Sequence, residues 1–224
     1  NLDFERLNSD TGVHFVQFLR ELSIQCRANN LVLSIDNYVP FNFNDYYRKQ
    51  ARALNKQART EFYNRASEEA RTAREQEYDF SLHSFIRTFT TTRLDRRFTS
   101  VVFDRYQYLG GTHGTTTRAG STWDFSIGSQ IPLSYFFRKN TPYKKIFLQN
   151  ICKQIEVQQE KEEILFFENP LKNAKQCFNE TNYYLTNDSV AIFYPLYTLA
   201  PYYAGILTYL VTFKSLNGIW LKDR

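Results

Sequence analysis

The chain has 224 residues, of which 42% are hydrophobic and 17% aromatic, and this composition excludes a wholly disordered protein. Its longest apolar run, residues 202–213, is too short to span a bilayer. The net charge is +5, and residues 1–50 carry five basic and six acidic side chains, so the rest of the chain carries +6. This excess favours an anionic partner such as a wall polymer, a membrane surface or nucleic acid, and a solvated basic surface without a partner is the alternative.

Three cysteines, Cys26, Cys152 and Cys177, lack the paired spacing of a zinc site, so we expect neither a metal nor another cofactor. Buried free thiols are the simplest interpretation, and a Cys152–Cys177 disulfide is the alternative if the protein is exported. The sequence starts at Asn1 and contains no methionine. We therefore expect a fragment or a processed product, whose export signal or membrane anchor would lie upstream.

The first fifty residues predict a strand, a helix and a second strand. Residues 1–5 have the pattern of a strand end, residues 9–30 carry a broad apolar helical face, and residues 31–40 form an apolar run closed by a proline. A strand, a helix and a strand within about 40 residues predict a βαβ unit with parallel strands.

Residues 44–77 predict one long helix. A narrow stripe, mostly alanine, repeats every three to four residues and can pack closely against a sheet. Arginines and lysines occupy the other faces, as they would in a helix that binds nucleic acid. Glutamates are interleaved with them, which favours a solvated face with internal ion pairs, so we expect no nucleic-acid partner.

Beyond Tyr78 the pattern changes to strands joined by turns, with one helix between them. Turns are predicted near residues 94–97, at Gly128 and at residues 187–188, and residues 205–213 predict a final strand. The helix is predicted to begin with Thr141 as its N-cap and Pro142 at its first position. Its apolar face is formed by Ile146, Phe147, Ile151 and Ile155. The fold class predicted for residues 50–224 is α+β, an antiparallel sheet with two packed helices.

A cluster of three glycines, which we call the glycine knot, separates two strand-like runs in "YQYLGGTHGTTTRAGSTWDF", residues 106–125. A phosphate cradle is excluded, because no lysine and no helix follow the glycines. Catalysis by His113 would need a nucleophile or a carboxylate beside it, and the nearest acids, Asp104 and Asp124, lie on the flanking strands. The favoured interpretation is a wide strand connection in which glycines adopt positive φ and His113 hydrogen-bonds the backbone.

This segment resembles the tyrosine–glycine–glycine–alanine–histidine–glycine signature of a bacterial extracytoplasmic domain, with Thr112 in place of the usual alanine. That domain forms the sensor region of the lysozyme-responsive anti-sigma-V factor of bacilli and accompanies a peptidoglycan N-acetylglucosamine deacetylase. A second segment, "FYPLYTLAPYYAG", is similar to the closing signature of the same family, and "ALNKQARTEFYN" resembles a helix near its start. The signature residues are Tyr108, Gly110, Gly111, His113 and Gly114 in the first segment and Tyr197, Pro201, Tyr202 and Gly205 in the second.

The resemblance covers residues 49–224 and implies a module outside the cytoplasmic membrane that binds or senses the cell wall and has no enzymatic activity of its own. The implied partner is a wall polymer or a lysozyme-like protein. Animal lysozymes are basic, so the charge of +6 on residues 51–224 would repel them at low salt and favours an anionic wall polymer.

Residues 1–48 resemble part of a family 18 glycoside hydrolase of the wall N-acetylglucosaminidase type, through "NLDFERL" and the helix and strand that follow it. The resemblance implies a fragment of a (β/α)8 barrel in which Glu5 is the general acid and Asp3 holds the acetamido group of the substrate. Such a barrel needs about 250 residues. The methionine-containing motif of that family is also missing, so we expect no glycosidase activity from this chain.

Overall fold

The structure is a computed structural model of the whole chain and describes residues 21, 28–29, 41–216 and 219–220. The chain divides into two units, residues 1–38 and 39–224, and almost all of the described residues lie in the second. The predicted strand–helix–strand segment falls almost entirely outside the described residues. Asp3 and Glu5 also lie outside them, so the hydrolase site remains a prediction.

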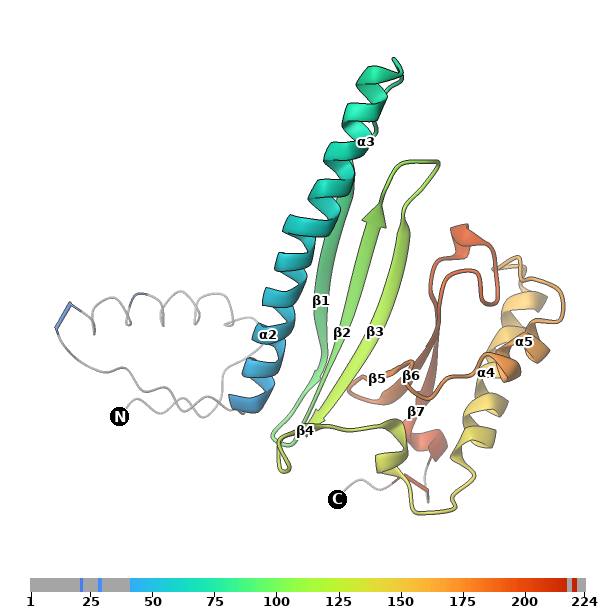
Figure 1. Cartoon of the computed structure of the whole chain (residues 1–224). Coiled ribbons are helices and arrows are strands. Elements are labelled where there is room, and N and C mark those ends of the chain that lie inside the picture. The colour runs from blue at the N-terminus through green and yellow to red at the C-terminus, as the bar shows by residue number, and fades with distance from the viewer. Residues whose placement is uncertain (1–20, 22–27, 30–40, 217–218, 221–224) are drawn as a thin grey trace. The chain divides into compact units, whose positions relative to one another are not determined.

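The predicted long helix is confirmed, although it begins three residues earlier and ends two residues earlier than expected. It consists of α2 (Phe41–Gln57), a π-helical turn (Ala58–Phe62) and α3 (Tyr63–Glu75), which follow one another without a break (Figure 1). Pairs of opposite charge four residues apart line its exposed faces, as the interleaved glutamates predict. These pairs are Lys49–Asp45 at 2.7 Å, Arg65–Glu69 at 2.9 Å and Arg71–Glu75 at 3.7 Å.

The stripe of the long helix packs against the first sheet. The Tyr47 ring lies 6.1 Å from that of Trp123, and the Phe62 ring lies 4.9 Å from that of Phe85. Near the end of the helix, Ala73 is only 2% exposed. Ala51 is exposed, so the buried part of the predicted stripe is interrupted at this position.

The first sheet has four antiparallel strands in the order β1-β2-β3-β4. Its strands are β1 (Ser84–Leu94), β2 (Phe98–Tyr108), β3 (Thr115–Asp124) and the short β4 (Ser129–Gln130). The predicted turn after β1 is closed by Asp95, whose carboxylate accepts the backbone N–H groups of Arg97 and Phe98 at 2.9 and 2.7 Å. Gly128, with φ +65°, forms the predicted turn before β4.

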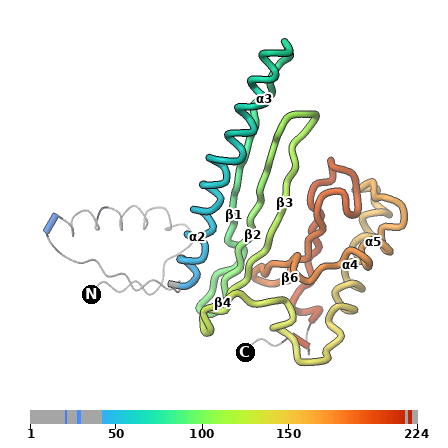
Figure 2. Tube along the Cα trace, in the orientation of Figure 1, coloured from blue at the N-terminus to red at the C-terminus, as the bar shows by residue number. Residues whose placement is uncertain are grey.

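A second antiparallel sheet lies in the C-terminal part, where one sheet was predicted for the whole domain. It has the order β5-β6-β7, formed by β5 (Tyr183–Leu185), β6 (Ser189–Tyr194) and β7 (Leu207–Thr212), which Figure 1 labels. Figure 2 traces this part of the chain in orange to red. The two sheets share hydrogen bonds, because Thr92 donates to the carbonyl of Leu185 at 2.6 Å and the Leu185 N–H group donates to Ser100 at 2.9 Å. The α+β class is confirmed.

Two helices cover the second sheet, α4 (Tyr143–Glu160) and α5 (Pro170–Gln176), and the second of them was not predicted. Pro142 occupies the N-cap position of α4, without a capping hydrogen bond from any side chain, so the predicted Thr141 cap is wrong. Of its predicted apolar face, Phe147, Ile151 and Ile155 are fully buried and Ile146 is partly buried. Cys152 and Cys177 are free thiols, but neither is buried as predicted, because Cys152 is partly exposed and Cys177 is exposed.

Candidate functional site

The glycine knot is the connection between β2 and β3, as predicted. Gly110 and Gly111 have φ values of +90° and +91°, which side chains other than glycine rarely adopt. The Tyr108 hydroxyl donates to the Gly111 carbonyl at 2.9 Å and closes the loop. Gly114 is buried against the ring of Tyr106, which occupies the space that a Cβ atom would need.

The second signature is the connection between β6 and β7. Leu199 and Ala200 are buried and fix this loop to the core. Tyr197 adopts a left-handed φ of +61°, and Gly205 ends a short 3₁₀ turn with φ +69°. Left-handed backbone in a residue other than glycine is uncommon and requires support from the surrounding structure.

The two signature loops meet. The imidazole of His113 stacks on the ring of Tyr202, with ring centroids 3.9 Å apart and an interplanar angle of 14°. Its Nε2 atom lies 3.3 Å from the hydroxyl of Tyr197, a residue 84 positions away in the sequence. Its Nδ1 atom lies 3.3 Å from the Gly114 carbonyl, the backbone contact that was predicted. We call His113, Tyr197 and Tyr202 the His–Tyr cluster.

The acids nearest in sequence to His113 are engaged elsewhere. Asp104 receives two hydrogen bonds from Arg118, at 2.8 and 2.7 Å, and Asp124 pairs with Arg97 at 2.9 Å. Among the described residues, the His113 ring contacts a backbone carbonyl, the hydroxyl of one tyrosine and the ring of another. Within the described residues, no three or more His, Cys, Asp or Glu side chains come together in a way that could hold a metal ion.

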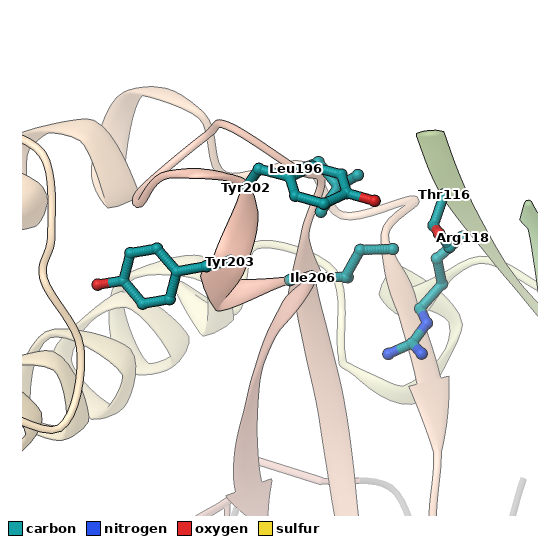
Figure 3. A pocket seen from close by; sticks show the side chains of 7 residues that line it. Thr116, Arg118, Leu196, Tyr202, Tyr203 and Ile206 are labelled. Carbon is teal, nitrogen blue, oxygen red and sulfur yellow. The ribbon is translucent and has the colours of Figure 1, made fainter. Parts of the chain in front are cut away.

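A hollow of about 280 Å³ adjoins the His–Tyr cluster. Figure 3 shows Tyr202 and Ile206 pointing toward Thr116 and Arg118 of β3, whereas Tyr203 points the opposite way. The Tyr203 hydroxyl accepts a hydrogen bond from the Leu165 N–H group at 2.9 Å. The lining residues are Thr116, Arg118, Leu196, Tyr202, Tyr203, Gly205 and Ile206.

Most of the lining residues escaped the sequence analysis. Thr116 and Arg118 are two positions apart in β3, so once the strand is predicted they are expected on the same face of it. Nothing in the sequence shows that this face meets the loop before β7, because that contact depends on how the two sheets pack. Pro201, a signature residue, precedes Tyr202 at the start of the 3₁₀ turn and is partly buried.

Comparison with known families assigns most of the chain to two regions. Residues 23–116 match the family model described as deacetylase PdaC, and residues 134–214 match DUF3298, a protein family of unknown function. Neither match covers half of the chain. The resemblance to the deacetylase-associated domain is thus supported at the level of the family, and the PdaC match begins inside the segment that resembles a glycoside hydrolase.

The His–Tyr cluster joins the two family regions. His113 lies at the end of the PdaC match, and Tyr197 and Tyr202 lie within the DUF3298 match. Contacts between the imidazole and the two phenols therefore connect one region with the other.

Two solved structures are similar to this chain. A DUF3298 family member from Bacteroides fragilis NCTC 9343 is 14% identical, with a TM-score of 0.53 over 82% of this chain and 71% of its own, which shows a shared fold. A DUF3298 family protein from Pseudomonas aeruginosa PAO1 is 16% identical with a TM-score of 0.48, over 62% of this chain, and this chain spans 62% of its length. A search of the curated proteins found no significant match.

No helix within the described residues is both long and apolar enough to cross a bilayer.

Proposed function

We propose that this chain is a non-enzymatic binding or sensing module of the bacterial cell envelope, located outside the cytoplasmic membrane. Its ligand contacts the His–Tyr cluster. The observation that carries the proposal is the meeting of the two signature loops in one exposed aromatic cluster, Tyr197 being 52% exposed. Association with the envelope is supported by the PdaC match over residues 23–116.

The chemistry of the cluster favours binding over catalysis. An acid–base mechanism would need a nucleophile or a carboxylate beside His113, and the two acids nearest to it in sequence are paired with arginines instead. Aromatic rings with polar edges are instead typical of binding surfaces, where flat faces pack on a ligand and hydroxyls orient it. Tyr197 and Tyr202 provide both the faces and the hydroxyls.

A wall polymer is the partner that the charge favours. Residues 51–224 carry +6, which attracts anionic polymers and repels a basic lysozyme at long range. The basic residues of the long helix are partly neutralised by its ion pairs, which weakens the case for nucleic acid. A lysozyme-like protein is the second partner to be tested.

Co-sedimentation of the full chain with purified peptidoglycan sacculi tests the proposal. We expect saturable binding that the substitution Tyr202→Ala weakens by about tenfold, the loss typical of a central aromatic contact. Tyr63→Ala is the matched control, because Tyr63 is a 68% exposed tyrosine on α3 with no place in the cluster. This control should bind like the unsubstituted protein.

Parallel titrations with lysozyme and with duplex DNA distinguish the partners. Binding to lysozyme alone would replace the wall polymer by a protein ligand and keep the sensing role. Binding to DNA alone, falling steeply with added salt, would refute an envelope function. Equal binding of both tyrosine variants to sacculi would remove the His–Tyr cluster as the contact surface.

A further inference from the structure

We propose that the hollow beside the His–Tyr cluster binds one uncharged pyranose ring of a polysaccharide. This inference deepens the proposed function and rests on it, because it names the part of a wall polymer that this site recognises. Four side chains form the proposed site, those of Thr116 and Arg118 on β3 and those of Tyr202 and Ile206 on the facing loop (Figure 3).

The charge of the hollow argues for an uncharged ligand. The guanidinium of Arg118 is paired with the Asp104 carboxylate in a bidentate geometry, at 2.8 and 2.7 Å. The pair has no net charge, and an incoming phosphate or carboxylate would have to displace Asp104 or lie close to it. The pair occupies the edge of the guanidinium that a phosphate or carboxylate would use, and the Asp104 carboxylate would repel a second anion there. The basic surface can attract an anionic wall polymer, but the hollow itself selects a neutral part of it.

The polar side of the hollow offers the donors and acceptors that sugar hydroxyls require. Besides the two bonds to Asp104, Arg118 donates one to the Thr208 hydroxyl at 3.2 Å. A guanidinium has five N–H groups. These contacts use three of them, so two remain for a ligand. The Thr116 hydroxyl, which also lines the hollow, can both donate and accept.

The apolar side of the hollow offers a surface for the carbon-bound hydrogens of a sugar ring. It is formed by the Tyr202 ring and the aliphatic side chains of Leu196 and Ile206. A volume of about 280 Å³ lies just below the usual range for small-molecule sites, about 300–1,000 Å³, and suits a single ring with its substituents. Aromatic walls combined with a few fixed polar groups are the usual composition of such sites.

Calorimetric titration of the full chain with fully N-acetylated chitotetraose, an uncharged tetrasaccharide of N-acetylglucosamine, tests the inference. We expect saturable binding that is the same at low and high salt, because no net charge is neutralised. Thr116→Val should weaken binding by about fivefold through the loss of one hydrogen bond. Thr117→Val is the matched control, since Thr117 is the exposed neighbour on the opposite face of β3 and its loss should leave the affinity unchanged.

The outcomes separate this inference from the proposed function. Binding to sacculi without binding to chitotetraose would overturn the pyranose site and leave the envelope module standing. Binding to chitotetraose that depends on Thr116, without binding to sacculi, would support the pyranose site and refute the wall assignment. Displacement of the tetrasaccharide by inorganic phosphate, or equal effects of Thr116→Val and Thr117→Val, would also overturn the site.

Discussion

Replacing Asp124 by asparagine is expected to destabilise the protein by about 3 kcal/mol or more, the usual cost of breaking a buried charge pair. Asp124 is fully buried, yet its carboxylate is ionised and saturated with hydrogen bonds. It accepts from Arg97 at 3.0 and 2.9 Å and from the Tyr135 hydroxyl at 2.9 Å. The Ser126 N–H group donates to it at 2.8 Å. An asparagine would leave Arg97 without its counter-charge.

The effect has a defined pH dependence. Burial alone would raise the pKa of Asp124, but hydrogen bonds from these three residues outweigh burial and hold the pKa below its ordinary value. A lowered pKa means that the stabilisation is complete above the unfolded-state pKa, about 4, and is lost as the pH falls through the folded-state pKa. In urea unfolding, the difference between the original protein and Asp124→Asn should therefore be largest near neutral pH and shrink below pH 4.

The matched control is Asp104→Asn, which breaks the pair with Arg118. Both side chains of that pair are partly exposed, 31% and 21%, so its loss should cost less than about 1 kcal/mol. Equal destabilisation by the two substitutions, or a difference that persists unchanged at low pH, would contradict the role given to Asp124.

Replacing Gly120 by alanine is expected to cost about 3 kcal/mol, the upper part of the range for overpacked sites. Gly120 lies in β3 where β5 crosses the first sheet. A Cβ atom there would lie 2.8 Å from the Tyr183 carbonyl carbon and closer still to its oxygen. The obstacle is backbone, so relief requires the second sheet to move away from the first. Thermal unfolding measures this cost.

Ala119→Val is the control for Gly120→Ala. Ala119 is the exposed neighbour of Gly120 and faces the other side of β3, so added bulk there should change stability by less than about 0.5 kcal/mol. A Gly120→Ala protein as stable as this control would show that the two sheets are not packed as closely as described.

Local patterns in the sequence predict most elements of residues 41–216. The long helix follows from the spacing of its stripe, and the hairpins follow from turn residues such as Gly128 between alternating strands. The short helix α5 was missed because its seven residues show too little periodicity, and only Pro170 at its first turn marks it. The division into two sheets was missed because strand signals do not say which strands pair.

The candidate site was predicted only in part. Both signature loops were identified, and the positive φ values of Gly110 and Gly111 follow from the glycines themselves. The meeting of His113 with Tyr202 could not be derived, because it depends on how the two sheets pack, and these two residues are about 90 positions apart in the chain. The pairing of Arg118 with Asp104 depends on the register of β2 and β3, in which these two residues are direct partners.

A double-mutant cycle on binding to peptidoglycan sacculi, with His113→Ala, Tyr202→Ala and the double variant, tests most directly whether the two signature loops form one binding surface. If they do, the two residues support each other, and the double variant should lose scarcely more affinity than either single variant. The account would be contradicted if the affinity lost in the double variant equalled the sum of the losses in the two single variants. It would also be contradicted if the double variant bound sacculi as well as the original protein. Either result would show that the meeting of the two loops is a feature of the fold and not the ligand site.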